Sequence, residues 1–332
     1  MVNSSIFTKS LEDTFGRKHD YLRLSVTDRC NLRCFYCMPE NVEFSPSEEL
    51  MQTDEIEAIC HDFVKMGVRK IRITGGEPLA RKDIDDILLR LAKMPVSLHM
   101  TTNGVLVSKH QEALLKSGIE SINVSLDSLN PKGFHHITRR NDFEKVMEAI
   151  EWLKTTPIKT KVNVVLMRGE NDHEITDFAD FAIQHNLDVR FIEFMPFQGN
   201  EWSINKRVSH QEVVSILENH LGNKLQTLAH QAHETSTNFK IEGTSAIVGL
   251  ISTVSQPFCG DCNRLRLTAD GKMKNCLFSD SELDLLSAFR NGTSIQPIVR
   301  KGVMKKRKER GGKDFNAKAD RENNRSMVRI GG

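Results

Sequence analysis

The chain has 332 residues, of which 39% are hydrophobic and 27% are charged, a composition typical of globular proteins. No apolar run approaches the ~18 residues of a membrane span, and residues 1–17 lack the apolar region of a signal peptide, so we expect a cytoplasmic protein without a membrane partner. The net charge of +2 hides a basic end, because 12 Lys or Arg stand against 4 Asp or Glu from Arg300 onward. This basic segment is compatible with binding nucleic acid, with binding an anionic substrate, or with simple solvation.

Strand and helix patterns alternate over the first two thirds of the chain. The expected strands are residues 21–26, 70–74, 96–101, 120–126, 159–166 and 188–194. The expected helices are residues 53–66, 83–93, 108–116, 142–154, 173–184 and 208–221. Alternation of this kind predicts an α/β fold with a parallel sheet, closed in part into a (β/α)6 TIM-like barrel. Functional groups are then expected at the carboxyl ends of the strands.

The pattern changes near residue 230. Short strand-like pieces follow, such as residues 238–241 and 246–251, with glycines between them. We therefore expect two domains: residues 1–230 form the barrel core, and residues 231–332 form a smaller C-terminal α+β domain.

Three cysteines lie within eight residues directly after the first expected strand: Cys30, Cys34 and Cys37. Soft thiolates suit iron, and three from one tight loop can hold three irons of a [4Fe–4S] cluster while the fourth iron stays open for a small molecule. Structural zinc is the alternative, but such sites normally close with four ligands and no fourth cysteine lies nearby. The loop therefore favours an iron–sulfur cluster.

A second triplet follows late in the chain: Cys259, Cys262 and Cys276. A CxxC pair with a distant cysteine is also compatible with zinc, so that alternative stays open. Beside the first triplet we favour a second three-thiolate cluster, and its open iron could hold a substrate. The seventh cysteine, Cys60, lies on the apolar face of an expected helix and is interpreted as a core thiol.

Two arginines occupy the strand-like segment that follows Cys262. Arg264 and Arg266 alternate with apolar residues and so point to the same side. Two guanidinium groups on one side can fork onto phosphate oxygens, although solvated surface arginines are the alternative. Their place beside cluster ligands favours an anion-binding role.

The CX3CX2C spacing, with Tyr36 before the last cysteine, resembles the signature of the radical S-adenosylmethionine (SAM) enzymes. The resemblance implies a cluster that cleaves SAM to a 5′-deoxyadenosyl radical. With CX2CX13C, the Gly-Gly-Glu-Pro run at 75–78 and the terminal Gly331-Gly332, nearly the whole chain resembles the GTP 3′,8-cyclase family of molybdenum cofactor (molybdopterin) biosynthesis. The implied reaction is hydrogen abstraction at C3′ of GTP and attack on C8, giving (8S)-3′,8-cyclo-7,8-dihydroguanosine 5′-triphosphate.

The resemblance also assigns roles to individual residues. The first three cysteines would hold the cluster that binds SAM, and the second triplet would hold a cluster whose open iron faces guanine. SAM contacts are assigned to Tyr36, Gly76, Ser125 and Met195. GTP contacts are assigned to Arg23, Arg72, Thr101 or Thr102, Lys161, Arg264, Leu265 and Arg266. Catalytic roles are assigned to Arg264, Arg266, Gly331 and Gly332. For the two glycines the resemblance implies that the tail reaches the active site, and a frayed terminus is the alternative.

The implied partners are GTP, a cyclic pyranopterin monophosphate synthase that acts on the product, and an external electron donor. The oligomeric state stays open, with a homodimer as one option. Two other functions remain alternatives: a radical SAM enzyme that modifies a peptide, and a zinc-containing nucleic-acid-binding protein. The second would leave the six strand–helix units unexplained, and the chain shows no RNA-binding motif, so we expect no nucleic-acid partner.

Overall fold

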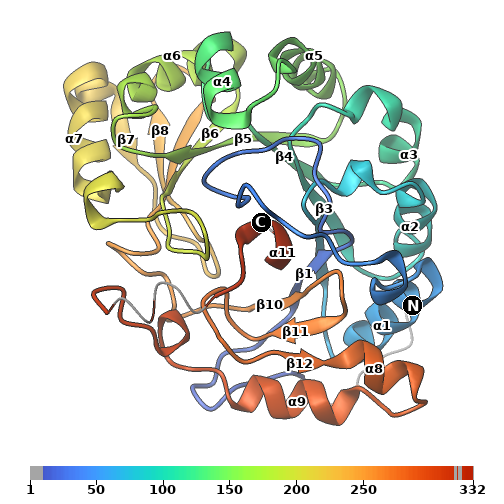
Figure 1. The fold of residues 1–332 in the computed structure, drawn as a ribbon. Coiled ribbons are helices and arrows are strands. Elements are labelled where there is room, and N and C mark those ends of the chain that lie inside the picture. Colours follow the sequence, from blue (N-terminus) through green and yellow to red (C-terminus); the bar gives the residue numbers. More distant parts are fainter. Residues whose placement is uncertain (1–9, 318–319, 321–323, 332) are drawn as a thin grey trace.

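The computed structural model describes residues 10–317, 320 and 324–331, and its fold is a curved sheet ringed by helices (Figure 1). The strands are β1 (Tyr21–Ser25), β2 (Lys70–Thr74), β3 (Ser97–Thr102), β4 (Ser121–Ser125), β5 (Lys159–Leu166), β6 (Asp188–Glu193), β7 (Leu225–Thr227), β8 (Thr237–Ile241), β9 (Ile247–Ile251), β10 (Arg264–Leu267), β11 (Lys272–Lys274) and β12 (Leu283–Asp284). The α-helices are α1 (Thr53–Lys65), α2 (Ile84–Leu91), α3 (Gln111–Lys116), α4 (Pro131–Thr138), α5 (Phe143–Lys154), α6 (Ile175–His185), α7 (His210–Leu221), α8 (Leu285–Arg290), α9 (Gln296–Met304) and α11 (Met327–Ile330).

The strand order of the sheet is β12-β11-β10-β1-β2-β3-β4-β5-β6-β9-β8-β7. The six expected strands stand in chain order and pair in parallel, which confirms the α/β barrel fold. Two strands from the later part of the chain extend it, since β10 pairs in parallel with β1 and β9 pairs in parallel with β6. The sheet thus runs across residue 230, and the expected division of the chain there stays a prediction.

Alternation along the strands separates two environments. Leu22, Leu24, Ile71 and Ile73 are fully buried and share one core with apolar residues of the surrounding helices, such as Phe63 of α1. Residues of the opposite parity are mostly polar and face the inside of the barrel. Burying each large aliphatic side chain stabilises the fold by roughly 1.5–3 kcal/mol, so the helix layer fixes which parity faces inward.

Helix α1 shows how a local pattern specifies an element. Ile56, Ile59, Cys60 and Phe63 recur at helical spacing and are buried against the sheet. Cys60 is fully buried in the main core and is a core thiol, as expected. None of the described helices combines the length and the apolar character needed to cross a membrane.

The sequence pattern did not predict α4. Pro131 occupies the first turn, and the Asn130 side chain accepts hydrogen bonds from the backbone N–H groups of Lys132 and Gly133. Proline at this position and an asparagine N-cap favour a helix start. The helix is only eight residues long and contains a glycine, so it offers only about two turns over which a hydrophobic period can be recognised.

The C-terminal segment ends inside the barrel. Figure 1 shows α11 within the ring of strands, while the blue segment between β1 and α1 passes across the barrel. Val328 and Ile330 of α11 are buried. The last described residues therefore belong to the interior of the fold.

Candidate active site

The first cysteine loop follows β1 and is held by the segment after β2. The Gly76 N–H donates to the Thr27 carbonyl at 2.7 Å, and the Glu77 N–H donates to the Arg29 carbonyl at 2.8 Å. A Cβ on Gly76 would lie 2.4 Å from the Arg29 carbonyl oxygen, so no larger residue fits there without moving the loop. A backbone approach this close explains why the Gly-Gly-Glu-Pro run follows the second strand.

Glu77 anchors the same loop to the end of β3. Its carboxylate is buried and accepts hydrogen bonds from the Thr102 hydroxyl at 2.7 Å and from the backbone N–H groups of Asn103 at 2.7 Å and Leu79 at 3.0 Å. Burial raises the pKa of Glu77 to about 7, although these donors oppose the shift. The Asn103 side chain in turn donates to Cys30 Sγ at 3.7 Å.

Tyr36 is fixed from the other side of the barrel. Its hydroxyl donates to Asp127 Oδ2 at 2.6 Å, and Asp127 Oδ1 accepts from the Val165 N–H at 2.8 Å. Burial raises the pKa of Asp127 to about 6. The aromatic residue before Cys37 therefore ties the cysteine loop to the ends of β4 and β5.

The three thiols of the first loop converge. Burial raises the pKa of Cys30 to about 11, with a further contribution from the negative charge of Glu77, and raises the pKa of Cys34 and Cys37. The mutual repulsion of their thiolates contributes to the shifts of the last two. Such thiols are stable as thiolates only with a cation among them, which fits a metal cluster.

Arg17, near the N-terminus, holds the segments around the second triplet together. Arg17 donates to the Cys259 and Lys308 carbonyls, both at 2.8 Å, and its Nε contacts Asp13 at 2.7 Å. The Arg310 N–H donates to Cys259 Sγ at 3.4 Å. These contacts fix the turn that carries the CxxC pair.

One thiol of the second triplet is prepared as a thiolate. Burial opposes ionisation of Cys262, yet the positive charges of Arg264 and Lys306 lower its pKa to about 6. Electrostatic coupling of Cys259 with Cys262 and Cys276 shows that the three sulfurs lie near one another. No group of His, Cys, Asp or Glu in the described part of the chain is arranged to hold one metal ion. A cubane does not need that arrangement, because each thiolate binds a different iron, so both triplets fit such a cluster.

The two triplets lie at opposite ends of the barrel. The first follows β1 at the carboxyl end of the parallel strands. Cys262 precedes β10, which is parallel to β1, and Cys276 follows the antiparallel β11, so both lie at the amino end. The expectation that function gathers only at the carboxyl ends is therefore incomplete, and the barrel interior lies between the two triplets.

That interior carries a surplus of positive charge. Inward-facing basic residues come from five strands: Arg23, Lys70, Arg72, Lys161, Arg190, Arg264 and Arg266. Burial alone would raise the pKa of Tyr21, yet the charges of Arg72, Arg23 and Lys70 lower it to about 7. Burial and the charge of Arg23 lower the pKa of Arg266 to about 9. The interior is thus prepared for an anion.

Several buried polar atoms of the interior lack a hydrogen-bond partner among the described residues. Thr101 Oγ1, Asn123 Oδ1, Asn163 Oδ1 and Arg264 Nη1 have no hydrogen-bond partner among the described residues. They lie on β3, β4, β5 and β10, with the inward parity. Buried polar groups without partners are costly, which indicates a polar molecule at this place. Thr102 differs from Thr101, because it points outward and donates to Glu77.

The other predicted site residues take varied positions. Arg72 donates to the Tyr21 hydroxyl at 2.8 Å and to the Met100 carbonyl at 2.6 Å, and Lys161 forms an ion pair with Asp188. Ser125 is half-buried at the end of β4. The Met195 carbonyl accepts from Asn200. Leu265 has the outward parity and is fully buried, so only its backbone can face a ligand.

The C-terminal Gly331 reaches the basic interior. Arg266 Nη1 donates to the Gly331 carbonyl at 2.7 Å. A Cβ on Gly331 would lie 2.7 Å from Thr74 Oγ1 and 2.8 Å from Ser25 Cβ, and its φ is +83°. Only glycine fits this place and this backbone conformation. Gly332 lies outside the described residues.

The sequence argument missed Arg190, Lys70, Asn123 and Asn163. Arg190 is opposite Asn163 in the β5–β6 register and is half-buried, within reach of the charge of Arg72. The sequence signal that could have found them is alternation along the strand, since each of these residues alternates with apolar core residues and so lies on the opposite face of the sheet. An expected strand alone does not show which parity faces a barrel interior.

The pH dependence of stability tests the buried contacts around Asp13, which Arg17 and His19 share. His19 is buried beside Asp13, and burial together with the charge of Lys306 lowers its pKa from 6.5 to about 4. The unfolded chain therefore binds the His19 proton more tightly than the folded chain does. The contribution of His19 to the free energy of unfolding is fully present above pH 6.5 and is lost as the pH falls toward 4. At pH 5 the loss is about 2 kcal/mol. Thermal unfolding between pH 5 and 7.5 should show this slope in the parent protein and a flatter one in His19→Gln. Equal slopes would contradict the assignment.

Comparisons with known proteins agree with the fold and the site. The Radical SAM superfamily model matches residues 24–182, and the Molybdenum Cofactor Synthesis C model matches residues 187–311. The fold resembles that of Streptococcus suis SuiB bound to S-adenosylmethionine, with a TM-score of 0.64 and 17% identity over 82% of this chain and 65% of that one. A barrel with a three-cysteine loop after its first strand thus defines a radical SAM protein.

Sequence relatives narrow the class further. The chain is 45% identical to "Molybdenum cofactor biosynthesis protein 1" of Bos taurus over 89% of its length, 42% identical to "GTP 3′,8-cyclase, mitochondrial" of Arabidopsis thaliana over 97%, and 41% identical to "GTP 3′,8-cyclase" of Peptoclostridium acidaminophilum over 100%. It spans 47%, 83% and 100% of those proteins, so it has about half the length of its animal relatives. The chain belongs to the GTP 3′,8-cyclase family, and its cofactors are SAM and two [4Fe–4S] clusters.

Proposed function

We propose that this chain is a GTP 3′,8-cyclase that forms (8S)-3′,8-cyclo-7,8-dihydroguanosine 5′-triphosphate from GTP. The observation that carries the proposal is the basic barrel interior between two cysteine triplets, where Thr101 Oγ1, Asn123 Oδ1 and Asn163 Oδ1 have no hydrogen-bond partner in the described part of the chain. Relatives named for this activity match the chain over 97% and 100% of its length. A nucleoside triphosphate supplies both the negative charge and the hydrogen-bonding groups that such an interior lacks.

The negative charge of the triphosphate is balanced by the arginines of the interior as a whole, and the nucleoside is assigned to the amides and the threonine. Arg266 and Arg264 line the end of the interior near the second triplet, while Arg23 and Arg190 face it from β1 and β6. Thr101 rather than Thr102 is assigned to GTP, because only its hydroxyl is inward and unpaired. Lys161 joins them through its charge, which Asp188 balances in part.

The first cysteine loop is assigned to SAM. Cys30, Cys34 and Cys37 would hold the cluster, and Tyr36, Gly76, Ser125 and Met195 would surround the bound SAM. When bound, the cluster and SAM would supply the chemistry that abstracts hydrogen from C3′ of GTP. The chain would keep water away from that chemistry by covering the barrel with the cysteine loop and with the segment that leads to Gly331.

The second cysteine triplet is assigned to the guanine end of the substrate. Cys259, Cys262 and Cys276 would hold the second cluster at the amino end of the barrel. Arg264 lies between this triplet and the interior, with its guanidinium 5.0 Å from the ring centroid of Phe258. The two clusters would thus approach the substrate from opposite ends.

The basic end of the chain supports this assignment over nucleic-acid binding. Lys306 donates to the Arg264 and Asn275 carbonyls, Lys313 pairs with Asp280, and Arg325 pairs with Asp270. These charges have partners within the fold. We further propose a cytoplasmic enzyme, since none of the seven cysteines, all of which lie within the described residues, forms a disulfide. A pyranopterin synthase would consume the product, and an external donor would supply electrons.

The test uses GTP carrying deuterium at C3′. The reconstituted chain, incubated anaerobically with SAM and a reductant, should transfer deuterium into 5′-deoxyadenosine and release the cyclised triphosphate. Unlabelled 5′-deoxyadenosine without a GTP product would overturn the proposed substrate. GTP with deuterium at C2′ is the matched control and should give no transfer.

A further inference from the structure

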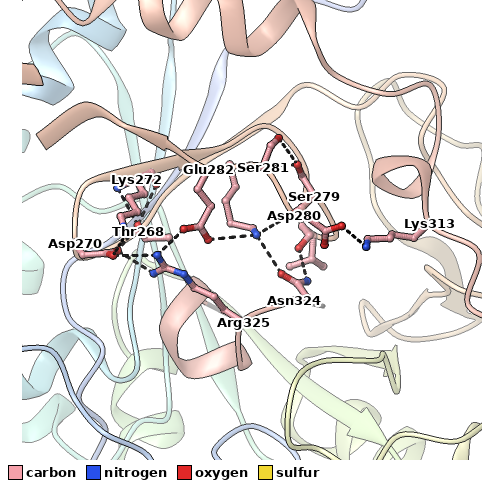
Figure 2. Close-up of polar contacts among 12 residues, drawn as sticks. Thr268, Asp270, Lys272, Ser279, Asp280, Ser281, Glu282, Lys313, Asn324 and Arg325 are labelled. Carbon is pink, nitrogen blue, oxygen red and sulfur yellow. Dashed lines mark hydrogen bonds and ion pairs between the residues drawn. The ribbon is translucent and has the colours of Figure 1, made fainter. Parts of the chain in front are cut away.

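We infer that Arg325 is a positioning residue whose ion pairs with Asp270 and Glu282 fix the C-terminal segment, so that the Gly331 carbonyl reaches Arg266. Figure 2 shows Arg325 pointing toward both carboxylates from the segment that leads into α11. The inference rests on the proposed function, because it concerns turnover at that site.

The geometry of the Arg325 contact is that of a fork. Nη1 donates to Asp270 Oδ1 at 3.1 Å, Nη2 donates to Asp270 Oδ2 at 3.0 Å, and Nη2 also reaches Glu282. The Arg325 side chain is 20% exposed and the two carboxylate side chains are 15% and 16% exposed. Burial alone would raise the pKa of Asp270, but its hydrogen bond with Arg325 keeps that pKa low. A two-pronged, half-buried pair holds its partners in one orientation.

The preceding residue adds a second attachment. Asn324 accepts a hydrogen bond from Lys274 Nζ at 3.1 Å and donates to the Leu277 carbonyl at 2.9 Å. The Lys274 side chain is 1% exposed and also contacts Glu282 at 3.5 Å. We call Lys274, Asp270, Glu282, Asn324 and Arg325 the clasp.

The segment beyond the clasp leads directly to the basic interior. Ile330 packs with Phe197, Phe278 and Phe315 in a small apolar cluster. The Gly331 N–H donates to the Met327 carbonyl, and its carbonyl accepts from Arg266. The segment is therefore attached at Arg325, in the middle by apolar packing, and at Gly331.

One hairpin carries both polar attachments. Arg266 lies on β10, and Asp270 lies in the turn between β10 and β11. The same hairpin separates Cys262 from Cys276. Without the clasp, the described residues 326–331 keep the apolar packing of Ile330 and the hydrogen bond from Arg266 to Gly331, besides hydrogen bonds within the segment itself. Short chain ends held so weakly tend to fray.

The experiment compares the reconstituted parent enzyme with Arg325→Ala and Arg325→Lys. Amide hydrogen exchange of residues 324–331, measured without GTP, should be about tenfold faster in Arg325→Ala, and turnover should fall by about the same factor at unchanged iron content. Arg325→Lys keeps the charge and should restore part of both. Arg290→Ala is the control, because Arg290 forms a comparable fork with Glu55 far from the segment, and it should leave exchange at 324–331 unchanged.

A double variant tests whether Arg325 acts through the tail. Arg325→Ala should cost little further turnover in a Gly331→Ala background, because both changes displace the same segment. Independent losses that multiply, or unchanged exchange at 324–331 in Arg325→Ala, would overturn the inference. The exchange result does not need GTP turnover. Absence of product in the parent enzyme would therefore contradict the proposed function while the clasp is still tested.

Discussion

Arg266→Ala is expected to weaken GTP binding about 100-fold while both cysteine triplets still bind iron. Arg266 is half-buried opposite Arg23 of the neighbouring strand, and burial and the charge of Arg23 lower its pKa to about 9. A guanidinium that is poorly stabilised without a ligand gains most when an anion arrives. Equilibrium binding of GTP to the anaerobic holoenzyme measures the effect.

Two further variants make the Arg266 result specific. Arg266→Lys keeps the charge but loses the planar fork, so its affinity should lie between those of the parent and the alanine variant. Arg90→Ala is the control, because Arg90 pairs with Asp54, Glu57 and Asp86 on the outer helices. Equal losses of GTP binding and of SAM cleavage in Arg266→Ala would contradict the assignment of Arg266 to GTP.

Gly331→Ala is expected to lower turnover at least about tenfold while iron content stays unchanged. The added methyl group would lie 2.7 Å from Thr74 Oγ1 and 2.8 Å from Ser25 Cβ, and the φ of +83° adds backbone strain. The tail must then leave its place, and Arg266 loses the carbonyl that it contacts. Steady-state formation of the cyclised product measures the effect.

Gly118→Ala is the control that separates backbone strain at a positive φ from displacement of the tail by a steric clash. Gly118 also has a positive φ, +61°, but a Cβ there would meet nothing within 4 Å. It ends the turn after α3, far along the chain from the tail. Its replacement should cost some stability and little turnover. Similar turnover in the two variants would show that the fit of Gly331 between Thr74 and Ser25 does not matter.

The order of elements was predictable because its signals are local. Apolar residues at strand and helix spacing gave all six strands of the first two thirds within a few residues of their observed bounds. The pairing of β10 with β1 was not predictable in this way, because it joins residues about 240 positions apart. The sequence placed Arg264 and Arg266 on one side of a strand, but only the pairing sets Arg266 beside Arg23.

The candidate site was predictable where spacing carries chemistry. Two cysteine triplets are visible as motifs, whereas Arg190 and Asn163 become neighbours only when the barrel brings β5 and β6 together. The clasp around Arg325 was not predictable for a related reason, since Asp270 and Glu282 lie between strands, in connections that no periodic pattern marks. Thr101 and Thr102 were indistinguishable until their parity was known.

The central claim is that two open-iron clusters face one substrate from opposite ends of the barrel. Anaerobic reconstitution with iron and sulfide, followed by iron counting and electron paramagnetic resonance with and without SAM and GTP, tests it most directly. We expect about eight irons per chain, with one cluster signal altered by SAM and the other by GTP. A zinc ion in place of the second cluster, or a second cluster signal indifferent to GTP, would contradict it.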